Sequence, residues 1–345
     1  MENQIKRINK RAVITLYTSL LLLLGIGVIA IGVGSVYISP ANVIRVLFSS
    51  KDTASTEYII IFNMRLARVI ASVFGGGALA LSGLLLQILF NNPIADPYVL
   101  GISSGARLFV GIILLGGVTL GFNILASPWL MFIGAFAGAM LVMFVMLGFA
   151  AKIKNITMLL IIGIMLGYLC SSLVGILVAF SDDHNIADFT KWNMGTFGLM
   201  TWEKIYVLVI VCSILFVLSF LLSKKLNALL LGESYAKTMG INIKVLRVLI
   251  IMFSGILTAV VTAFAGLIAF VGMSVPHIAR LLLKSEDARV LLPATIILGG
   301  IFGVGCDLIA RTIAAPNELA VGTITSFVGV PIVLFLLIKR NSARA

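Results

Sequence analysis

Long uncharged stretches separated by short polar segments dominate the chain. The stretch from Val69 to Phe90 follows Arg65 and Arg68, and its ~22 residues correspond to roughly 33 Å of α-helix at ~1.5 Å per residue. That length matches the ~30 Å hydrocarbon core of a bilayer. Along the whole chain the same pattern predicts an all-α, polytopic membrane protein of about ten transmembrane helices, with residues 1–345 forming a single permease-like domain.

The predicted spans cover residues 12–36, 66–90, 98–118, 126–150, 156–180, 204–222, 291–310 and 320–338, plus two spans within the uncharged stretch 248–279. Because that stretch is too long for one span and short for two, Gly266, Gly272 and Pro276 are expected to bend it. Residues 37–64 are expected to form an external loop with a short surface helix near 41–48. The basic clusters at both chain ends are expected on the cytoplasmic side, which requires an even number of spans.

Composition excludes a soluble protein. Hydrophobic residues make up 61% of the chain and charged residues 11%, whereas charged residues are about 25% of a soluble domain. The net charge of +12 follows from the positive-inside rule, since most of the 25 Lys and Arg residues fall on the side assigned to the cytoplasm. Membrane lipid, not nucleic acid, is the expected surrounding. Three cysteines lie in apolar segments without a Cys/His cluster, so neither a disulfide nor a metal site is predicted.

The stretch 65–106 carries a family resemblance. It combines an R-x-x-R pair, a small-residue helix with a late Gln87, the run N-P-I-A-D-P, and the run G-I-S-S-G-A. Together these motifs resemble the FecCD-type permeases, and later motifs extend the resemblance from about residue 12 to 340. The fold is therefore expected to be similar to that of the cobalamin permease. Members are membrane subunits of ABC importers for iron–siderophores, haem or cobalamin, which places the chain in a bacterial cell membrane with both termini cytoplasmic.

The resemblance implies that the energy for transport comes from partner subunits. The sequence contains no G-x-x-x-x-G-K-[ST] phosphate loop, so the chain is expected neither to hydrolyse ATP nor to hold a cofactor. The implied partners are a second permease copy or a related permease, two cytoplasmic ATPase subunits that bind ATP, and one extracytoplasmic substrate-binding protein. An ion-coupled secondary transporter is the alternative. It would depend on Asp307, an acid within a span. Arg311 follows one turn later, so the two side chains are expected to form a pair that neutralises itself.

A polar segment at about 226–243 is the predicted ATPase contact. Gly232, Ala236 and Gly240 lie four apart, so a helix here would show one smooth face to another protein. Glu233 favours the amino end of a short helix, and Gly240 suits its carboxyl end. A solvated amphipathic loop is the alternative. The pattern is similar to the coupling loop of FecCD-type permeases, which implies ATPase contacts at Gly232, Glu233, Ser234, Ala236, Met239 and Gly240.

Three arginines near the predicted outer helix ends are exceptions to the charge pattern. In FecCD-type permeases an R-x-x-R pair and an arginine in a D-L-I-A-R motif receive carboxylates of the binding protein, which implies docking roles for Arg65, Arg68 and Arg311. Arginine suits this role because its planar fork pairs bidentately with a carboxylate. Topological anchoring or contact with lipid headgroups is the alternative.

Small residues recur every four positions in the span 156–180, at Gly163, Gly167, Ser171, Gly175 and Ala179. Such a stripe indicates either tight helix packing or a route for a bulky substrate. The resemblance implies a route between two permease copies, narrowed at its cytoplasmic end by Asn92, Ile94 and Thr157. Ile156 departs from the hydroxyl residue expected from the cobalamin permease, which puts the second constriction in doubt. His277, in V-P-H-I-A-R, is assigned no ligand role.

Overall fold

A computed structural model describes residues 2–34, 36, 38–48, 55–98, 100–116, 128–153, 155–315 and 317–342. The elements are α1 (Glu2–Gly32), α2 (Pro40–Phe48), α3 (Thr56–Tyr58), the π-helix η1 (Ile59–Leu66), α4 (Ala67–Phe90), α5 (Ile102–Leu114), α6 (Pro128–Lys152), α7 (Ile156–Ala179), α8 (Asp183–Asn193), α9 (Trp202–Leu221), α10 (Ser223–Leu230), α11 (Glu233–Thr238), α12 (Ile243–Ala265), α13 (Val271–Leu283), α14 (Ala288–Thr312) and α15 (Val321–Ser342).

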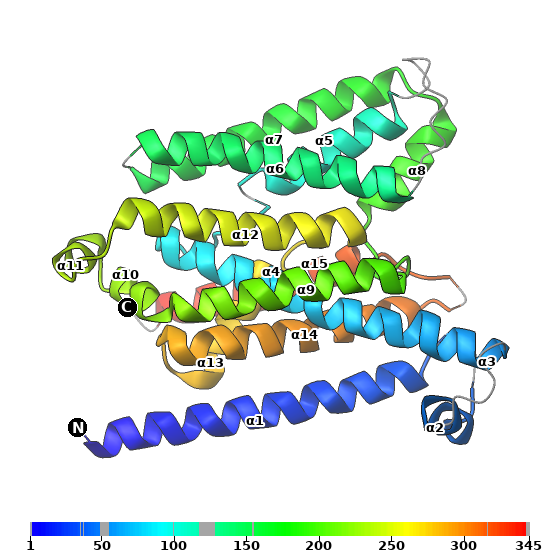
Figure 1. The fold of residues 1–345 in the computed structure, drawn as a ribbon, viewed down its shortest axis with the longest axis horizontal. Coiled ribbons are helices and arrows are strands. Elements are labelled where there is room, and N and C mark those ends of the chain that lie inside the picture. Colours follow the sequence, from blue (N-terminus) through cyan, green and yellow to red (C-terminus); the bar gives the residue numbers. More distant parts are fainter. Residues whose placement is uncertain are drawn as a thin grey trace.

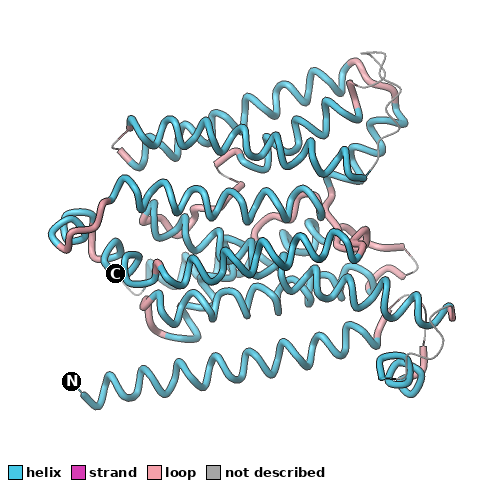
Figure 2. The backbone as a smooth tube through the Cα atoms, in the orientation of Figure 1, coloured by secondary structure: helices cyan, strands magenta, loops and turns pink. Residues whose placement is uncertain are grey.

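The long helices lie side by side along one direction (Figure 1). α1 lines one flank of the bundle, and α5, α6 and α7 form a group on the opposite flank. The start of α1, the end of α15, α10 and α11 lie at one end, and α2, α3 and α8 lie at the other. Figure 2 shows helices joined by loops, without strands in the described part of the chain.

In the described residues, the expected number of about ten membrane-crossing helices is reached only when three shorter apolar helices are counted. Seven helices are long and apolar enough to cross a bilayer, and three shorter apolar helices, Ile102–Leu114, Val271–Leu283 and Val321–Phe335, complete the set. The predicted surface helix near 41–48 corresponds to α2. An even number of crossings agrees with the two chain ends lying at the same end of the bundle (Figure 1).

One sequence-based boundary is wrong, and of the three residues expected to bend the stretch 248–279 only Gly266 lies at the bend. The second spanning segment begins at Thr56, not at residue 66, because α3 and η1 continue directly into α4. The apolar pattern hides this extension since Glu57, Asn63 and Arg65 interrupt it. The bend between the seventh and eighth spans lies between Gly266 and Phe270, both at positive φ, while Gly272 and Pro276 lie inside α13.

The core of the bundle is α4. Almost every residue of this helix is buried, because α14, α12, α13 and α9 surround it. Small residues permit backbone-to-backbone contact in lipid, and a Cβ added to Gly76 would collide with the Gly299 backbone of α14. α12 is joined to α4 by hydroxyl groups, with Ser82 Oγ 2.6 Å from Ser254 Oγ and 2.8 Å from Thr258 Oγ1.

Candidate functional site

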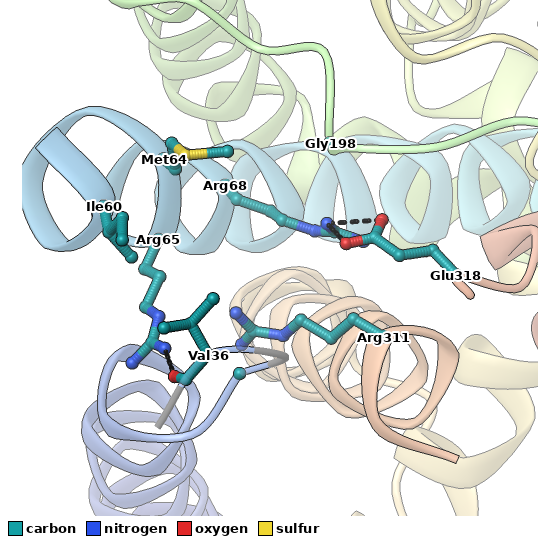
Figure 3. A pocket seen from close by; sticks show the side chains of 9 residues that line it. Val36, Ile60, Met64, Arg65, Arg68, Gly198, Arg311 and Glu318 are labelled. Carbon is teal, nitrogen blue, oxygen red and sulfur yellow. Dashed lines mark hydrogen bonds and ion pairs between the residues drawn. The ribbon is translucent and has the colours of Figure 1, made fainter. Parts of the chain in front are cut away.

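An arginine cluster (Figure 3) lies where η1 meets α4 and where α14 ends, at the end of the bundle opposite α11 in Figure 1. We define it as Arg65, Arg68 and Arg311 with the acids Asp307 and Glu318. The three arginines are buried, with 3–7% of their surface exposed. A cavity of about 100 Å³ is lined by all three arginines and by Glu318. The structure therefore brings together the three residues that the sequence predicted as a docking site.

Two of these arginines bind the carboxyl end of α1. Arg65 Nη1 donates to the carbonyls of Ile31 (3.1 Å) and Gly32 (2.8 Å), and its Nη2 donates to the Val36 carbonyl. Arg311 Nη2 donates to the Ala30 carbonyl. The last carbonyls of a helix have no intrahelical partner and carry partial negative charge, so cations are stabilising there. Arg65 and Arg311 thus supply hydrogen bonds to the last carbonyls of α1 and also contribute positive charge to the cavity.

Arg68 is the arginine that pairs with acids. Its Nε donates to both oxygens of Asp307, at 2.8 and 3.0 Å, and its Nη1 donates to Glu318, at 2.8 and 3.0 Å. The expected pair between Asp307 and Arg311 is present at a longer 3.7 Å. Glu318 was not found by the sequence analysis, because it lies in the turn before the last span and its partner is 250 residues away. Its side chain is 42% exposed, in contrast to 1% for Asp307.

The predicted ATPase contact forms the helix α11, which begins and ends as the sequence indicates. Glu233 lies in its first turn, Gly232 precedes it and Gly240 follows it, both glycines at positive φ. The expected smooth face of small residues is wrong, because Ala236 is fully buried while Gly232 and Gly240 lie outside the helix. The exposed surface carries larger side chains instead, including Tyr235 (48% exposed) and Met239 (58%), beside the exposed Ser234.

An ion pair fixes α11 to the bundle. Arg247 of α12 donates from Nη2 to Glu233 Oε1 at 3.1 Å and from Nη1 to the Ile153 carbonyl, after α6, at 2.8 Å. The Arg247 side chain is 8% exposed. Through Arg247, α11 is thus connected to α12 and to the end of α6.

The residues assigned to the constriction lie at two helix ends near the α11 side. α4 ends at Asn91, whose φ of +45° is left-handed, and Asn92 Oδ1 then accepts a hydrogen bond from the Ile94 amide at 3.0 Å. Ile94 is 47% exposed. Thr157 is exposed in the first turn of α7, where Asn155 Oδ1 accepts from its amide at 2.9 Å.

The small-residue stripe of α7 has two halves. Gly163 and Gly167 pack against the start of α5, because a Cβ on Gly101 would lie 3.0 Å from the Gly163 carbonyl and from the Gly167 amide. Ser171, Gly175 and Ala179 are exposed. A four-residue step turns a helix by about 400°, so the stripe drifts by roughly 40° per step away from the buried face. Packing against α5 explains the first half of the stripe, and the second half is exposed on the surface of this chain.

Comparison with known proteins establishes the family. The model of the FecCD transport family matches residues 21–339. The chain belongs to the FecCD transport family. The hemin transport system permease protein HmuU of Yersinia pestis is 33% identical over 342 residues, covering 98% of this chain and 99% of that protein. The vitamin B12 import system permease protein BtuC of Klebsiella pneumoniae subsp. pneumoniae is 37% identical over 281 residues, covering 81% and 83%.

A solved structure confirms the fold of this FecCD family member. An inward-facing conformation of a metal-chelate type ABC transporter matches with a TM-score of 0.81 and 30% identity, covering 94% of this chain and 98% of that one. The chain is thus a multi-pass membrane permease subunit of an ABC importer and not an enzyme. Membership implies ATPase and substrate-binding partners.

Proposed function

We propose that this permease imports a bulky metal chelate, such as haem, cobalamin or an iron–siderophore, as one half of a permease dimer. Two ATPase subunits would bind ATP and grip α11 from the cytoplasm, and a binding protein would deliver cargo over the arginine cluster. The supporting observation is the polarity of the molecule, because an exposed helix and a cationic cavity occupy opposite ends of one bundle.

The proposed ATPase contact uses the exposed side chains of α11. Tyr235 and Met239 expose apolar surface, and the Glu233–Arg247 ion pair holds α11 against α12. Large exposed side chains of this kind typically anchor protein interfaces. Glu233, Ser234 and Met239 stay in the proposed contact, whereas the buried Ala236 supports the helix from behind, and Gly232 and Gly240 permit the turns on either side.

The proposed contact with the binding protein centres on Arg68. Arg65 and Arg311 bind α1 carbonyls, whereas Arg68 Nη1 pairs with the partly exposed Glu318. A carboxylate on the binding protein would compete with Glu318 for this edge of the guanidinium, while Arg68 Nη2 is buried without a hydrogen-bond partner among the described residues. The route would then run between two copies along Ser171 and the exposed half of the α7 stripe, with Asn92, Ile94 and Thr157 near its cytoplasmic end.

Reconstitution tests this function. The permease would be placed in proteoliposomes with its ATPase and binding protein, and accumulation of haem, cyanocobalamin and a ferric siderophore would be measured with and without ATP. Accumulation of one chelate that requires ATP and both partners is expected. Accumulation driven by a proton or sodium gradient, with no nucleotide-hydrolysing subunit present, would contradict the proposal.

A further inference from the structure

The short helix α13 holds the chain break that follows α4. His277 Nε2 lies 2.9 Å from the Pro93 carbonyl. Because a carbonyl can only accept, the ring proton is on Nε2. Gln87 Nε2 donates to the carbonyls of Gly272 (3.1 Å) and Met273 (3.3 Å), and Arg280 Nη1 donates to Gln87 Oε1 at 2.7 Å. Two helices are thus joined at the point where α4 stops.

These bonds add anchors from α13 to a segment whose local hydrogen bonds include the Asn92 amide to the Gln87 carbonyl at 3.2 Å. Backbone groups freed by a break at membrane depth need partners from elsewhere in the protein. Pro93 has no amide hydrogen, and its carbonyl accepts from His277. Asn92 and Ile94 flank Pro93 directly. The proposed constriction residues are therefore anchored to α13 as well as to the end of α4.

The carboxyl end of α13, where Arg280 lies, continues towards the end of the bundle that holds α10 and α11. The loop after α13 leads to Asp287, which caps α14 by accepting from the Arg289 amide at 2.9 Å. Asn227 of α10 binds both parts of this cap, donating to Asp287 Oδ1 at 2.7 Å and accepting from the Ala288 amide at 2.7 Å. The Arg289 side chain holds the pKa of Asp287 at about 2, so the cap stays ionised at neutral pH.

These two sets of hydrogen bonds are joined by the loop between α13 and Asp287. α11 is preceded directly by α10, and α10 reaches the start of α14 and the loop after α13 through Asn227. A polar hollow of about 130 Å³ separates α10 from the break and is lined by Asn92, His277, Arg280 and Leu230. The hollow gives the break space in which to move relative to α10.

We propose that α13 carries motion from the ATPase contact to the cytoplasmic constriction, with His277 and Arg280 as the positioning residues that fix the Asn91–Pro93 break. This inference rests on the proposed function, because the roles of α11 and of Asn92 and Ile94 belong to it. His277 neither binds cargo nor takes part in ATP hydrolysis. Its hydrogen bond to Pro93 makes Asn92 and Ile94 move together with α13.

The test compares His277→Ala with His277→Gln in the complete reconstituted importer. A glutamine side chain keeps an N–H donor for the Pro93 carbonyl, whereas alanine has none. For His277→Ala we expect ATP hydrolysis to stay within about twofold of wild type and chelate imported per ATP to fall about tenfold, equivalent to ~1.4 kcal/mol. His277→Gln is expected to restore most of the import.

A labelling readout separates positioning from a merely structural role. Ile94→Cys is read with a maleimide, and the native cysteines Cys170, Cys212 and Cys306 are buried, so they add little background. In the otherwise wild-type importer the labelling rate is expected to differ between the ATP-bound and nucleotide-free states. With His277→Ala that difference is expected to disappear, and with His277→Gln it is expected to return.

Two further variants keep the test decisive. Leu281→Ala, an exposed position on the same helix, is expected to behave as wild type. Asn227→Ala removes the hydrogen bonds between α10 and the Asp287 cap and is expected to uncouple import as His277→Ala does, which covers the case in which His277→Ala does not assemble. Wild-type import per ATP and state-dependent labelling in His277→Ala or Asn227→Ala would overturn the inference. Failure of the wild-type complex to import any chelate would instead contradict the proposed function, and the inference with it.

Discussion

Asp307 is the buried acid that pairs with two of the arginines in the cluster. It is 1% exposed, receives both close bonds from Arg68 Nε and has Arg311 within 3.7 Å. The sequence predicted a self-neutralising pair with Arg311 on the same helix, and the structure adds the shorter bond to α4. Asp307 therefore neutralises cations from two helices at once.

Asp307→Asn should destabilise the protein without abolishing ATP coupling. Removal of this charge leaves two buried guanidinium groups facing a neutral amide, and loss of one partner from a buried ion pair costs about 3–5 kcal/mol. Thermal unfolding in detergent measures this effect, with Asp188→Asn, a half-exposed acid of α8, as the near-neutral control. Import per ATP by the folded fraction should stay close to wild type. A selective loss of energy coupling in folded protein would favour the secondary-transporter alternative.

Glu318 occupies the edge of Arg68 at which the binding protein is proposed to dock. Glu318→Gln should therefore strengthen binding, because it removes a competing carboxylate. The pair is partly exposed, so a modest gain of about two- to fivefold in affinity is expected. Equilibrium binding to the permease in nanodiscs measures this gain. Glu203→Gln, an exposed acid at the start of α9, is the matched control. Weaker binding by Glu318→Gln would show that Glu318 contributes to docking itself.

At the scale of the helix, the contact between α4 and α14 depends on glycine. A Cβ on Gly76 would collide with the backbone of Gly299 and lie close to Gly303, and backbone cannot move aside as a flexible side chain can. Gly76→Ala should cost about 1–3 kcal/mol by overpacking. Gly148→Ala in α6 is the control, because nothing lies within 4 Å of its added Cβ, and alanine favours a helix by ~1 kcal/mol over glycine. Thermal unfolding of both variants checks the contrast, and equal stabilities would contradict the packing argument.

The helices could be predicted from the sequence, but their partners could not. Uncharged stretches of bilayer length locate most spans, because a charge in lipid is costly. The same rule fails at Thr56–Leu66, where polar residues interrupt the pattern although the helix continues. The expectation that Gly272 bends the chain also fails. Gly272 lies inside α13 and permits its close approach to α4, since a Cβ there would be 3.0 Å from the Leu79 carbonyl. That role depends on a residue far away in the chain.

At the scale of the molecule, motifs located both candidate sites but not how they are built. The R-x-x-R and D-L-I-A-R motifs marked the arginine cluster, yet Glu318 and the α1 carbonyls are joined to it only by folding. Regular spacing suggested a smooth face on α11, and the structure instead turns Ala236 inward and Tyr235 outward. Spacing gives the period of a helix, but its neighbours decide which side is buried.

The orientation of the bundle in the membrane is a prediction that labelling can test. The wild-type cysteines are buried, whereas Met239 after α11 is 58% exposed and Ile313 after α14 is 68% exposed. The positive-inside rule predicts that α11 lies in the cytoplasm. In intact cells a membrane-impermeant maleimide should therefore label Ile313→Cys and leave Met239→Cys unlabelled. Inside-out vesicles should reverse the result, with wild-type protein as the unlabelled control. Labelling of Met239→Cys in intact cells would place the ATPase contact outside the cell, and an importer driven from the cytoplasm could not work in that orientation.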